Sequence, residues 1–142
     1  MTVLCDTSLV VKWFFSAAEA DVTAARSILA AGIDGRLDLT VLDLTYLELG
    51  NVGIRSLGLP AEETSELLER LRLVCGDGIR VGGGLLARIA RLAAAHRLTF
   101  YDASYWGVAD ARDLDLVTAD RALLDAGAGE SPAAFARRLG LA

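Results

Sequence analysis

Two short apolar runs that each lead to an aspartate constrain the fold of this chain most strongly. The run at residues 3–5 ends at Asp6, and the run at residues 116–118 leads to Asp120. Continuous apolar runs of this length are typical of strands buried on both faces of a parallel sheet. If both strands are central and parallel, their carboxyl ends lie at the same edge of the sheet. The two aspartates are then expected to lie side by side.

The rest of the chain alternates between strand and helix patterns. Strands are predicted near residues 3–5, 37–41, 79–81 and 115–118, and helical patterns separate them. This alternation is typical of α/β folds, in which right-handed crossovers place helices on both faces of a parallel sheet. A chain of 142 residues without a linker or an internal repeat is expected to form one such domain, residues 1–142.

Two further acids stand in or at the start of helical segments. Asp102 opens a helical segment after the loop at residues 96–99, and Glu48 lies within the helical stretch at residues 44–57. An ion pair with an arginine of another helix is the main structural alternative for Glu48. For the three aspartates the structural alternative is helix capping, because each precedes helix-forming residues and Asp is a preferred N-cap residue.

Brought together, the four acids Asp6, Glu48, Asp102 and Asp120 predict an oxygen-rich pocket. Carboxylates a few ångströms apart cannot all remain ionised in a partly buried cleft, so either some are protonated or a divalent cation neutralises them. A set of oxygen ligands favours Mg²⁺ or Mn²⁺. Such a cation suits phosphodiester hydrolysis, because it can activate water and stabilise charge on the leaving oxygen.

Cysteine usage and charge limit the compartment and the partners. Cys5 and Cys75 form no zinc-binding spacing, and we interpret them as reduced thiols of a cytoplasmic protein. No basic segment precedes the first strand and Lys12 interrupts the most apolar early stretch, so neither a signal peptide nor a membrane span is expected. The net charge of −5 predicts low nonspecific affinity for nucleic acid. Five arginines are candidates for local phosphate contacts: Arg55, Arg97, Arg121, Arg137 and Arg138.

Four short motifs resemble those of PIN-domain ribonucleases. They are Asp6-Thr7-Ser8, Glu48-Leu49-Gly50-Asn51, Tyr101-Asp102-Ala103 and Thr118-Ala119-Asp120. Each motif alone is weakly specific, but the four occur in the order of the family and span nearly the whole chain. The continuation at residues 10–13 and the compact length are most similar to the VapC toxins of bacterial toxin–antitoxin pairs.

The resemblance implies a fold, an activity and a set of site residues. The implied fold is a PIN-like three-layer α/β/α sandwich with a central, mostly parallel sheet of four to five strands. The implied activity is that of a Mg²⁺- or Mn²⁺-dependent endoribonuclease that cuts structured RNA, usually tRNA or rRNA. Asp6, Asp102 and Asp120 would be the metal-facing catalytic acids, and Glu48 would complete the pocket.

Two other features are interpreted beside that site. Ser8 and Thr118 carry hydroxyls that could hold a carboxylate or a metal-bound water, or could bond the local backbone instead. Residues 131–139 predict a helix where many relatives have a final strand, which puts the fifth strand in doubt.

The resemblance also implies protein partners. A small cognate antitoxin is expected to lay an apolar helix against the Glu48 helix and the helix after Pro60, where Leu67, Leu68 and Leu71 could exceed what the core buries. Equally, these leucines could pack internally or form a homodimer. The alternative function is a non-catalytic PIN-like binding module that acts through protein partners, although such a module has no need of four acids.

Overall fold

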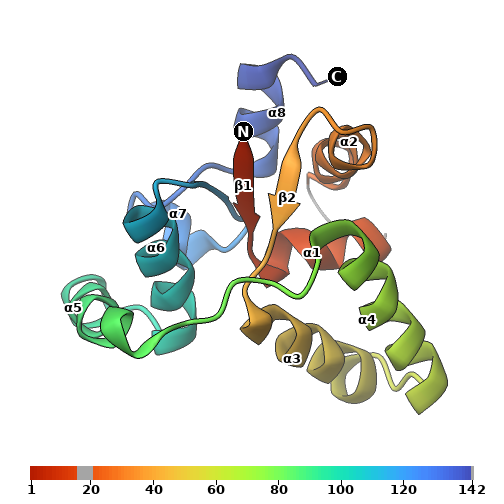
Figure 1. Ribbon diagram of the computed structural model, residues 1–142, viewed down its shortest axis with the longest axis horizontal. Coiled ribbons are helices and arrows are strands. Elements are labelled where there is room, and N and C mark those ends of the chain that lie inside the picture. Colours follow the sequence, from red (N-terminus) through yellow and green to blue (C-terminus); the bar gives the residue numbers. More distant parts are fainter. Residues whose placement is uncertain (16–20, 142) are drawn as a thin grey trace.

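A parallel sheet runs through the centre of the molecule (Figure 1), for which the computed structural model describes residues 1–15 and 21–141. Strand β1 (Thr2–Cys5) lies between β2 (Asp38–Thr40) and β3 (Asp115–Val117), and both neighbours run parallel to it. The register pairs Leu4 with Thr40 on one side and with Leu116 on the other. The central position of β1 explains its continuous apolar sequence, because both of its faces are covered.

The described residues form three strands, fewer than the four to five that were predicted. Each sheet edge instead carries one isolated parallel bridge, Leu42 to Ile79 beside β2 and Val117 to Glu130 beside β3. Glycines at 82–84 follow the first of these segments closely and disfavour an extended strand. Pro132 begins a helix two residues after Glu130, so the second segment ends at its bridge. The predicted strand near residues 79–81 is therefore reduced to a single bridge.

Helices connect the strands as the sequence patterns predicted. Their bounds are α1 (Thr7–Phe14), α2 (Val22–Ile33), α3 (Asp43–Asn51), α4 (Ala61–Cys75), α5 (Leu86–His96), α6 (Phe100–Arg112), α7 (Arg121–Asp125) and α8 (Pro132–Leu139). A π-helical turn (Val52–Ser56) continues α3, and a 3₁₀ turn (Gly83–Leu85) precedes α5. The predicted C-terminal helix is confirmed as α8, which Ser131 caps through its side chain.

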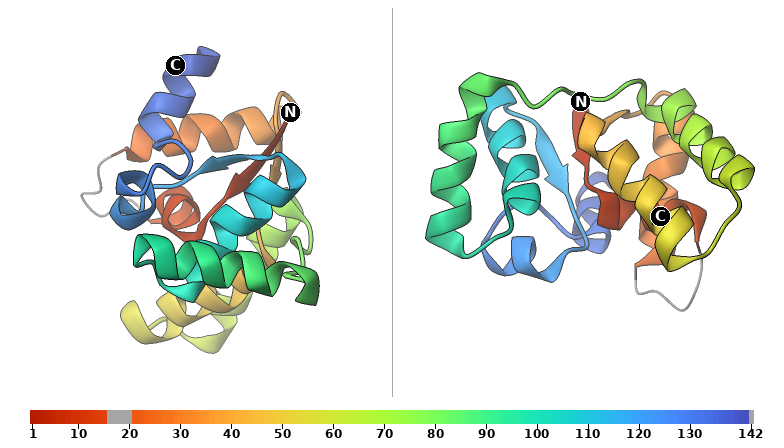
Figure 2. Two further views of the ribbon diagram at one scale, coloured as in Figure 1. Left: turned by 90° about the vertical axis from the view of Figure 1, so that its left-hand side faces the viewer. Right: turned by 90° about the horizontal axis from the view of Figure 1, so that it is seen from below.

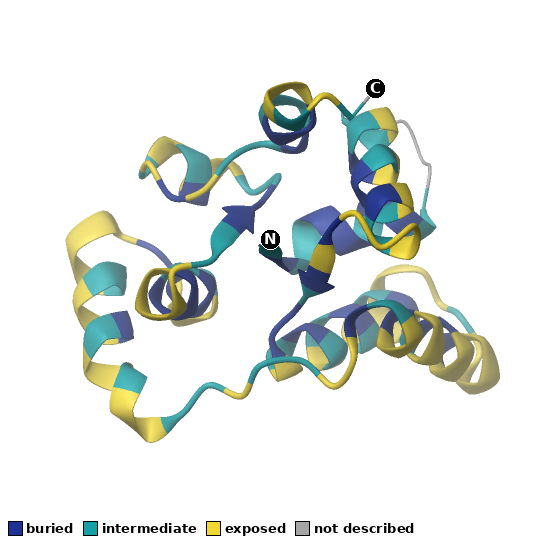
Figure 3. Ribbon diagram, turned by 45° about the horizontal axis from the view of Figure 1, so that its top comes forward, coloured by how far each residue is buried: buried dark blue, intermediate teal, exposed yellow. Residues whose placement is uncertain are grey.

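Two hydrophobic cores cover the two faces of the sheet. Val3 and Cys5 of β1 belong to one core, whereas Leu4 between them belongs to the other, as the alternation of side chains along a strand requires. The first core includes side chains of α1, α2, α4 and α8, and the second includes side chains of α5, α6 and α7. Figure 2 shows these two groups on opposite sides of the strands, and Figure 3 shows exposed residues on the outer faces of the helices. The predicted three-layer α/β/α arrangement is confirmed.

The leucines of α4 pack mainly into the first core. Leu67 is 5% exposed and Leu71 is fully buried, and Leu68 is half-buried against the same core. Internal packing, one of the alternatives for these residues, is therefore what the structure shows. Leu67 and Leu71 present no surface to a partner, so the prediction that these two leucines line a groove for the antitoxin is wrong. Within the described residues, no helix combines the length and the apolar character needed to cross a membrane.

Candidate active site

The carboxyl ends of β1 and β3 place Asp6 and Asp120 at the same edge of the sheet, as predicted. Asp6 is the N-cap of α1, where its Oδ1 accepts a hydrogen bond from the backbone N–H of Leu9 at 3.1 Å. Asp120 is the N-cap of α7, where its Oδ1 accepts one from the N–H of Ala122 at 3.1 Å. Ligand sites of parallel α/β sheets lie at this edge. Asp6 and Asp120 therefore cap their helices and also lie at the same edge of the sheet, so both interpretations hold for these two acids.

Asp102 reaches the same region from the first turn of α6. Thr99 caps this helix, because its Oγ1 accepts a hydrogen bond from the backbone N–H of Asp102 at 3.0 Å. The capping alternative for Asp102 is therefore wrong. Its carboxylate is not the N-cap of the helix and interacts with Asp120 and Thr99.

Two hydroxyls hold the buried carboxylate of Asp6, which is 3% exposed. Ser8 Oγ donates to Asp6 Oδ1 at 2.6 Å, and Thr118 Oγ1 donates to Asp6 Oδ2. The same hydroxyls accept from the loop after β3, since the N–H of Ala119 donates to Ser8 and that of Asp120 donates to Thr118, each at 2.9 Å. The predicted role of Ser8 and Thr118 in holding a carboxylate is confirmed, and both residues also join the two loops.

The three aspartates influence one another electrostatically. Burial and, to a lesser degree, the charge of Asp120 raise the pKa of Asp6 to about 6, against the opposing effect of its hydrogen bonds. Burial also raises the pKa of Asp102 to about 7, together with a hydrogen bond to Asp120, the charge of Asp120 and the charge of Asp6. The site therefore concentrates negative charge that a proton or a cation can relieve.

A separate group of hydroxyls surrounds Glu48, which is half-buried on α3. Its Oε1 accepts hydrogen bonds from Thr7 Oγ1 at 2.7 Å and from the Tyr105 hydroxyl at 2.6 Å. The Tyr105 hydroxyl also lies 2.7 Å from Thr45 Oγ1. Burial and the neighbouring charge of Glu48 hold the pKa of Tyr105 well above its ordinary value, so Tyr105 keeps its proton as a donor. Among the described residues no arginine pairs with Glu48, so the ion-pair alternative is not realised.

The four predicted acids are brought together in part. Within residues 1–15 and 21–141, no three His, Cys, Asp or Glu side chains are arranged closely enough to hold a metal ion as they stand. Asp6, Asp102 and Asp120 interact electrostatically, whereas hydroxyl donors engage Glu48. The donor chemistry nevertheless fits a hard divalent cation, because all four groups are carboxylates and two of them have raised pKa values.

Sequence reasoning missed the residues around Glu48. Thr45 and Tyr105 were not predicted, and Thr7 was part of a motif without a role of its own, although each carries a hydroxyl within hydrogen-bonding distance of Glu48 or of a neighbour. One signal was present in the sequence. Tyr105 follows Asp102 by three residues, so both lie on one face of a helix, and Thr7 directly follows Asp6.

The raised pKa of Asp102 predicts how stability depends on pH without bound cations. In the unfolded chain Asp102 ionises near its ordinary value of 3.8, but in the folded chain it ionises at about 7. Folding stability is therefore lost progressively as pH rises between these values. Asp102→Asn cannot ionise at this position, so we expect it to melt at a higher temperature than wild type in EDTA, with a difference that is small near about pH 4 and largest above about pH 7.

Differential scanning fluorimetry across this pH range measures the effect. Asp125→Asn is the matched control, because Asp125 is exposed at the end of α7. A melting difference between Asp102→Asn and wild type that stays constant with pH would contradict the raised pKa.

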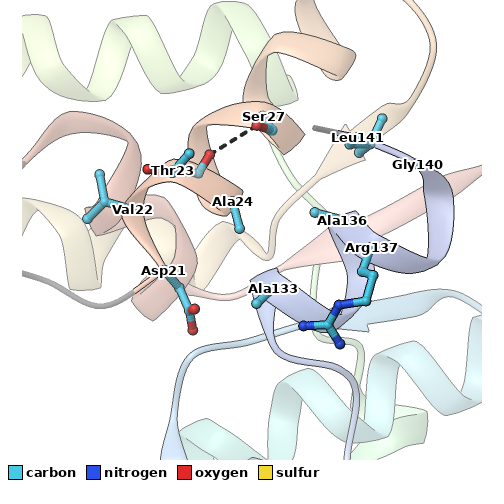
Figure 4. A pocket seen from close by; sticks show the side chains of 10 residues that line it. All are labelled: Asp21, Val22, Thr23, Ala24, Ser27, Ala133, Ala136, Arg137, Gly140 and Leu141. Carbon is cyan, nitrogen blue, oxygen red and sulfur yellow. Dashed lines mark hydrogen bonds between the residues drawn. The ribbon is translucent and has the colours of Figure 1, made fainter.

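Two apolar hollows lie on the surface of the described residues. One of about 550 Å³ is lined by Asp43, Leu44, Leu47, Val81, Leu86, Phe100, Tyr101 and Ser104. Leu47 directly precedes Glu48, and Tyr101 directly precedes Asp102. The other, of about 710 Å³, lies between α2 and α8 (Figure 4), where Asp21 and Arg137 are the charged lining residues. None of the four acids is among the described residues that line either hollow.

Comparison with known proteins places the whole arrangement in one family. The family model described as the PIN domain matches residues 3–129. The protein named Exonuclease VapC9 from Pyrobaculum aerophilum is 36% identical over 92 residues, which cover 65% of this chain and 69% of that protein.

Solved structures share the fold. The crystal structure of PAE2754 from Pyrobaculum aerophilum is 27% identical, covers 99% of this chain and 90% of that chain, and gives a TM-score of 0.72. The crystal structure of FitAcB from Neisseria gonorrhoeae is 20% identical, covers 92% of this chain and 97% of that chain, and gives a TM-score of 0.63. At 20% identity, the likeness to FitAcB concerns the fold alone.

Proposed function

This chain belongs to the PIN-domain family, and on that premise we propose that it is a metal-dependent endoribonuclease, the toxin of a toxin–antitoxin pair. One observation carries the proposal most strongly. Asp6, held by two hydroxyls at the carboxyl end of β1, lies within electrostatic range of Asp102 and Asp120. The similarity to a protein named Exonuclease VapC9 supports a nuclease.

The residues that would hold a divalent cation are Asp6, Asp102 and Asp120, with Glu48 acting directly or through water. We infer Mg²⁺ or Mn²⁺, because hard cations prefer carboxylate oxygens. Such an ion supplies an activated water and stabilises the charge that develops on the leaving oxygen. The chain itself fixes the orientation of Asp6 through Ser8 and Thr118, and the raised pKa of Asp102 favours a proton on that carboxylate when no cation is bound.

RNA contacts near the acids must come from few basic side chains. Arg121 is exposed directly after Asp120, and Arg97 is exposed at the end of α5, ahead of Asp102. Both are in position to contact phosphates of a substrate. Arg138 is less suited to this role, because it donates to Glu130 at 2.6 Å. The substrate class that we propose is structured RNA such as tRNA or rRNA, recognised by shape.

The proposal is tested by cleavage of total cellular RNA with Mg²⁺, with Mn²⁺ and with EDTA, followed by mapping of the new ends. A circular RNA distinguishes the two modes of cleavage, because only an endonuclease can open it, whereas an exonuclease needs a free end. If the protein cuts linear RNA but not circular RNA, its activity is that of an exonuclease and not of an endonuclease. Binding of partner proteins with no cleavage in any metal would favour the alternative function, a non-catalytic PIN-like module.

We also propose that a second copy of the chain covers the apolar groove that Leu47 and Tyr101 line. Leu47 is 75% exposed and Tyr101 is 61% exposed in this groove, and among the described residues that line it only Asp43 is charged. Contiguous exposed apolar surface of this kind marks protein interfaces. RNA is a poor occupant because no lysine or arginine lines the groove. Two copies can meet here symmetrically, since each presents the same apolar residues.

Leu47→Glu is expected to convert this homodimer to a monomer, because it places a charge in the centre of an apolar contact. Leu73→Glu is the matched control, since Leu73 is 81% exposed on α4, outside the groove. Light scattering coupled to size-exclusion chromatography measures both masses. A monomeric wild type, or a Leu47→Glu variant that remains dimeric, would refute this interface.

A cytoplasmic location fits this proposal. Cys5 and Cys75 are buried free thiols, which is usual for proteins of a reducing compartment.

A further inference from the structure

Three hydroxyl groups from three different elements converge beside Glu48. Thr7 lies at the start of α1, Thr45 lies on α3 one turn before Glu48, and Tyr105 lies on α6. Thr45 is fully buried and Tyr105 is 2% exposed, whereas Glu48 is half-buried. The group therefore lies in the interior, and the carboxylate lies at its outer end.

The direction of the hydrogen bonds around Glu48 follows from two facts: a carboxylate oxygen only accepts, and each hydroxyl donates one proton. Four close oxygen–oxygen contacts join these side chains, at 2.6 to 2.9 Å, but the hydroxyls supply only three protons. If Tyr105 and Thr7 both donate to Glu48, then Thr45 donates to Tyr105 and every proton is used. The contact between Thr7 and Tyr105 then carries no proton, because both hydroxyls point at the same acceptor. This arrangement satisfies an ionised Glu48 with two donors.

Both donors bind the same oxygen of Glu48. Oε1 accepts from Thr7 and from Tyr105, whereas Oε2 has no hydrogen-bond partner among the described residues. A carboxylate held by one oxygen has a fixed orientation, and its other oxygen remains free for a ligand outside the protein core. The same three side chains link the segment after Asp6 and the helix of Asp102 to Glu48.

We propose that Tyr105, supported by Thr45 and Thr7, is a positioning residue that fixes Glu48 through Oε1 and leaves Oε2 free for a ligand. The inference rests on the proposed function, because it assigns to Oε2 a cation or its bound water. Tyr105 itself has no contact with substrate in this role. It differs from Ser8 and Thr118, which hold Asp6.

Removal of a single hydroxyl tests the proposal with little change in packing. Tyr105→Phe keeps the ring in the core but deletes the donor to Glu48. We expect Mn²⁺ affinity, measured by isothermal titration calorimetry, to fall by roughly tenfold, and kcat for RNA cleavage to fall by at least as much while KM for RNA stays unchanged. Tyr46→Phe is the matched control, because the Tyr46 hydroxyl donates to the backbone carbonyl of Gly76, away from the acids. It is expected to match wild type in both measurements.

A double-mutant cycle separates positioning from packing. In a Glu48→Ala background, Tyr105→Phe should cause no further loss of Mn²⁺ affinity or of kcat, because its only target has been removed. A full additional loss in this background would overturn the proposal and assign Tyr105 a purely structural role. If Tyr105→Phe does not fold, Thr7→Val replaces it. Thr7→Ser is then the conservative variant that should recover wild-type values.

The position of Glu48 can be checked independently of any activity. In a crystal structure of Tyr105→Phe we expect the Glu48 side chain to leave the position that it holds in wild type. An unchanged Glu48 would overturn the positioning role even if the variant were inactive. Conversely, a displaced Glu48 in a protein whose wild type cleaves no RNA would support the positioning role and refute the proposed function.

Discussion

Asp6→Asn is expected to lower metal-dependent RNA cleavage by about a hundredfold or more without unfolding the protein. The expected loss is large because Asp6 is the most deeply buried of the four acids, and its two oxygens are oriented by Ser8 and Thr118. Asn has almost the same shape and is as good an N-cap as Asp, so its side-chain oxygen can still accept from the N–H of Leu9. The substitution therefore removes the negative charge and replaces the acceptor of the Thr118 hydrogen bond with an amide donor, while the N-cap is kept.

The control for this experiment is Asp125→Asn, which removes a charge from the exposed end of α7. Its cleavage rate should equal that of wild type. Added Mn²⁺ should also raise the melting temperature of wild type more than that of Asp6→Asn, because only wild type retains the full set of acids for the ion. Cleavage at the wild-type rate by a folded Asp6→Asn variant would remove Asp6 from the site.

The parts of the site that follow from strand order were predictable from the sequence. Asp6 and Asp120 each follow a strand of a parallel sheet, and the carboxyl ends of such strands always share one edge. The hydroxyl support from Ser8 and Thr118 followed for the same reason, since both lie within two residues of these aspartates. Local sequence is sufficient for such contacts because the strands alone fix their positions.

The contacts of Glu48 could not be predicted in this way. They depend on how α3 and α6 pack across the end of the sheet, and no sequence pattern gives that distance. The burial of Leu67 and Leu71 has the same origin, because an apolar helix face looks alike whether it meets a core or a partner. At residue 79, a single bridge replaces the strand that was predicted for residues 79–81. The glycines at 82–84 end the pairing soon after it. These glycines were visible in the sequence, but the strand was predicted from the apolar residues before them.

Expression of this chain alone is expected to arrest growth of the host cell, whereas expression of the Asp6→Asn variant is expected to leave growth unchanged. The difference should be large, because a ribonuclease acts catalytically on RNA that the cell needs, and the variant lacks the charge on which cleavage is proposed to depend. Growth curves after induction, with protein levels matched by immunoblot, measure it. Equal growth with both proteins at equal levels would argue against a toxin.

Co-expression with the neighbouring reading frame is expected to restore growth and to yield a stable complex on purification. The inhibitor cannot use Leu67 and Leu71, which the core already buries, so its decisive contact is expected at the acids. Burial and, to a lesser degree, the neighbouring carboxylates raise the pKa values of Asp6 and Asp102 to about 6 and about 7, and a lysine or arginine that reaches both acids would offset the negative charge there. A cation and that side chain then compete for one site, so inhibition of RNA cleavage should weaken as Mg²⁺ is raised. Inhibition that is independent of Mg²⁺ would place the partner elsewhere on the surface, and the absence of any complex would argue against an antitoxin.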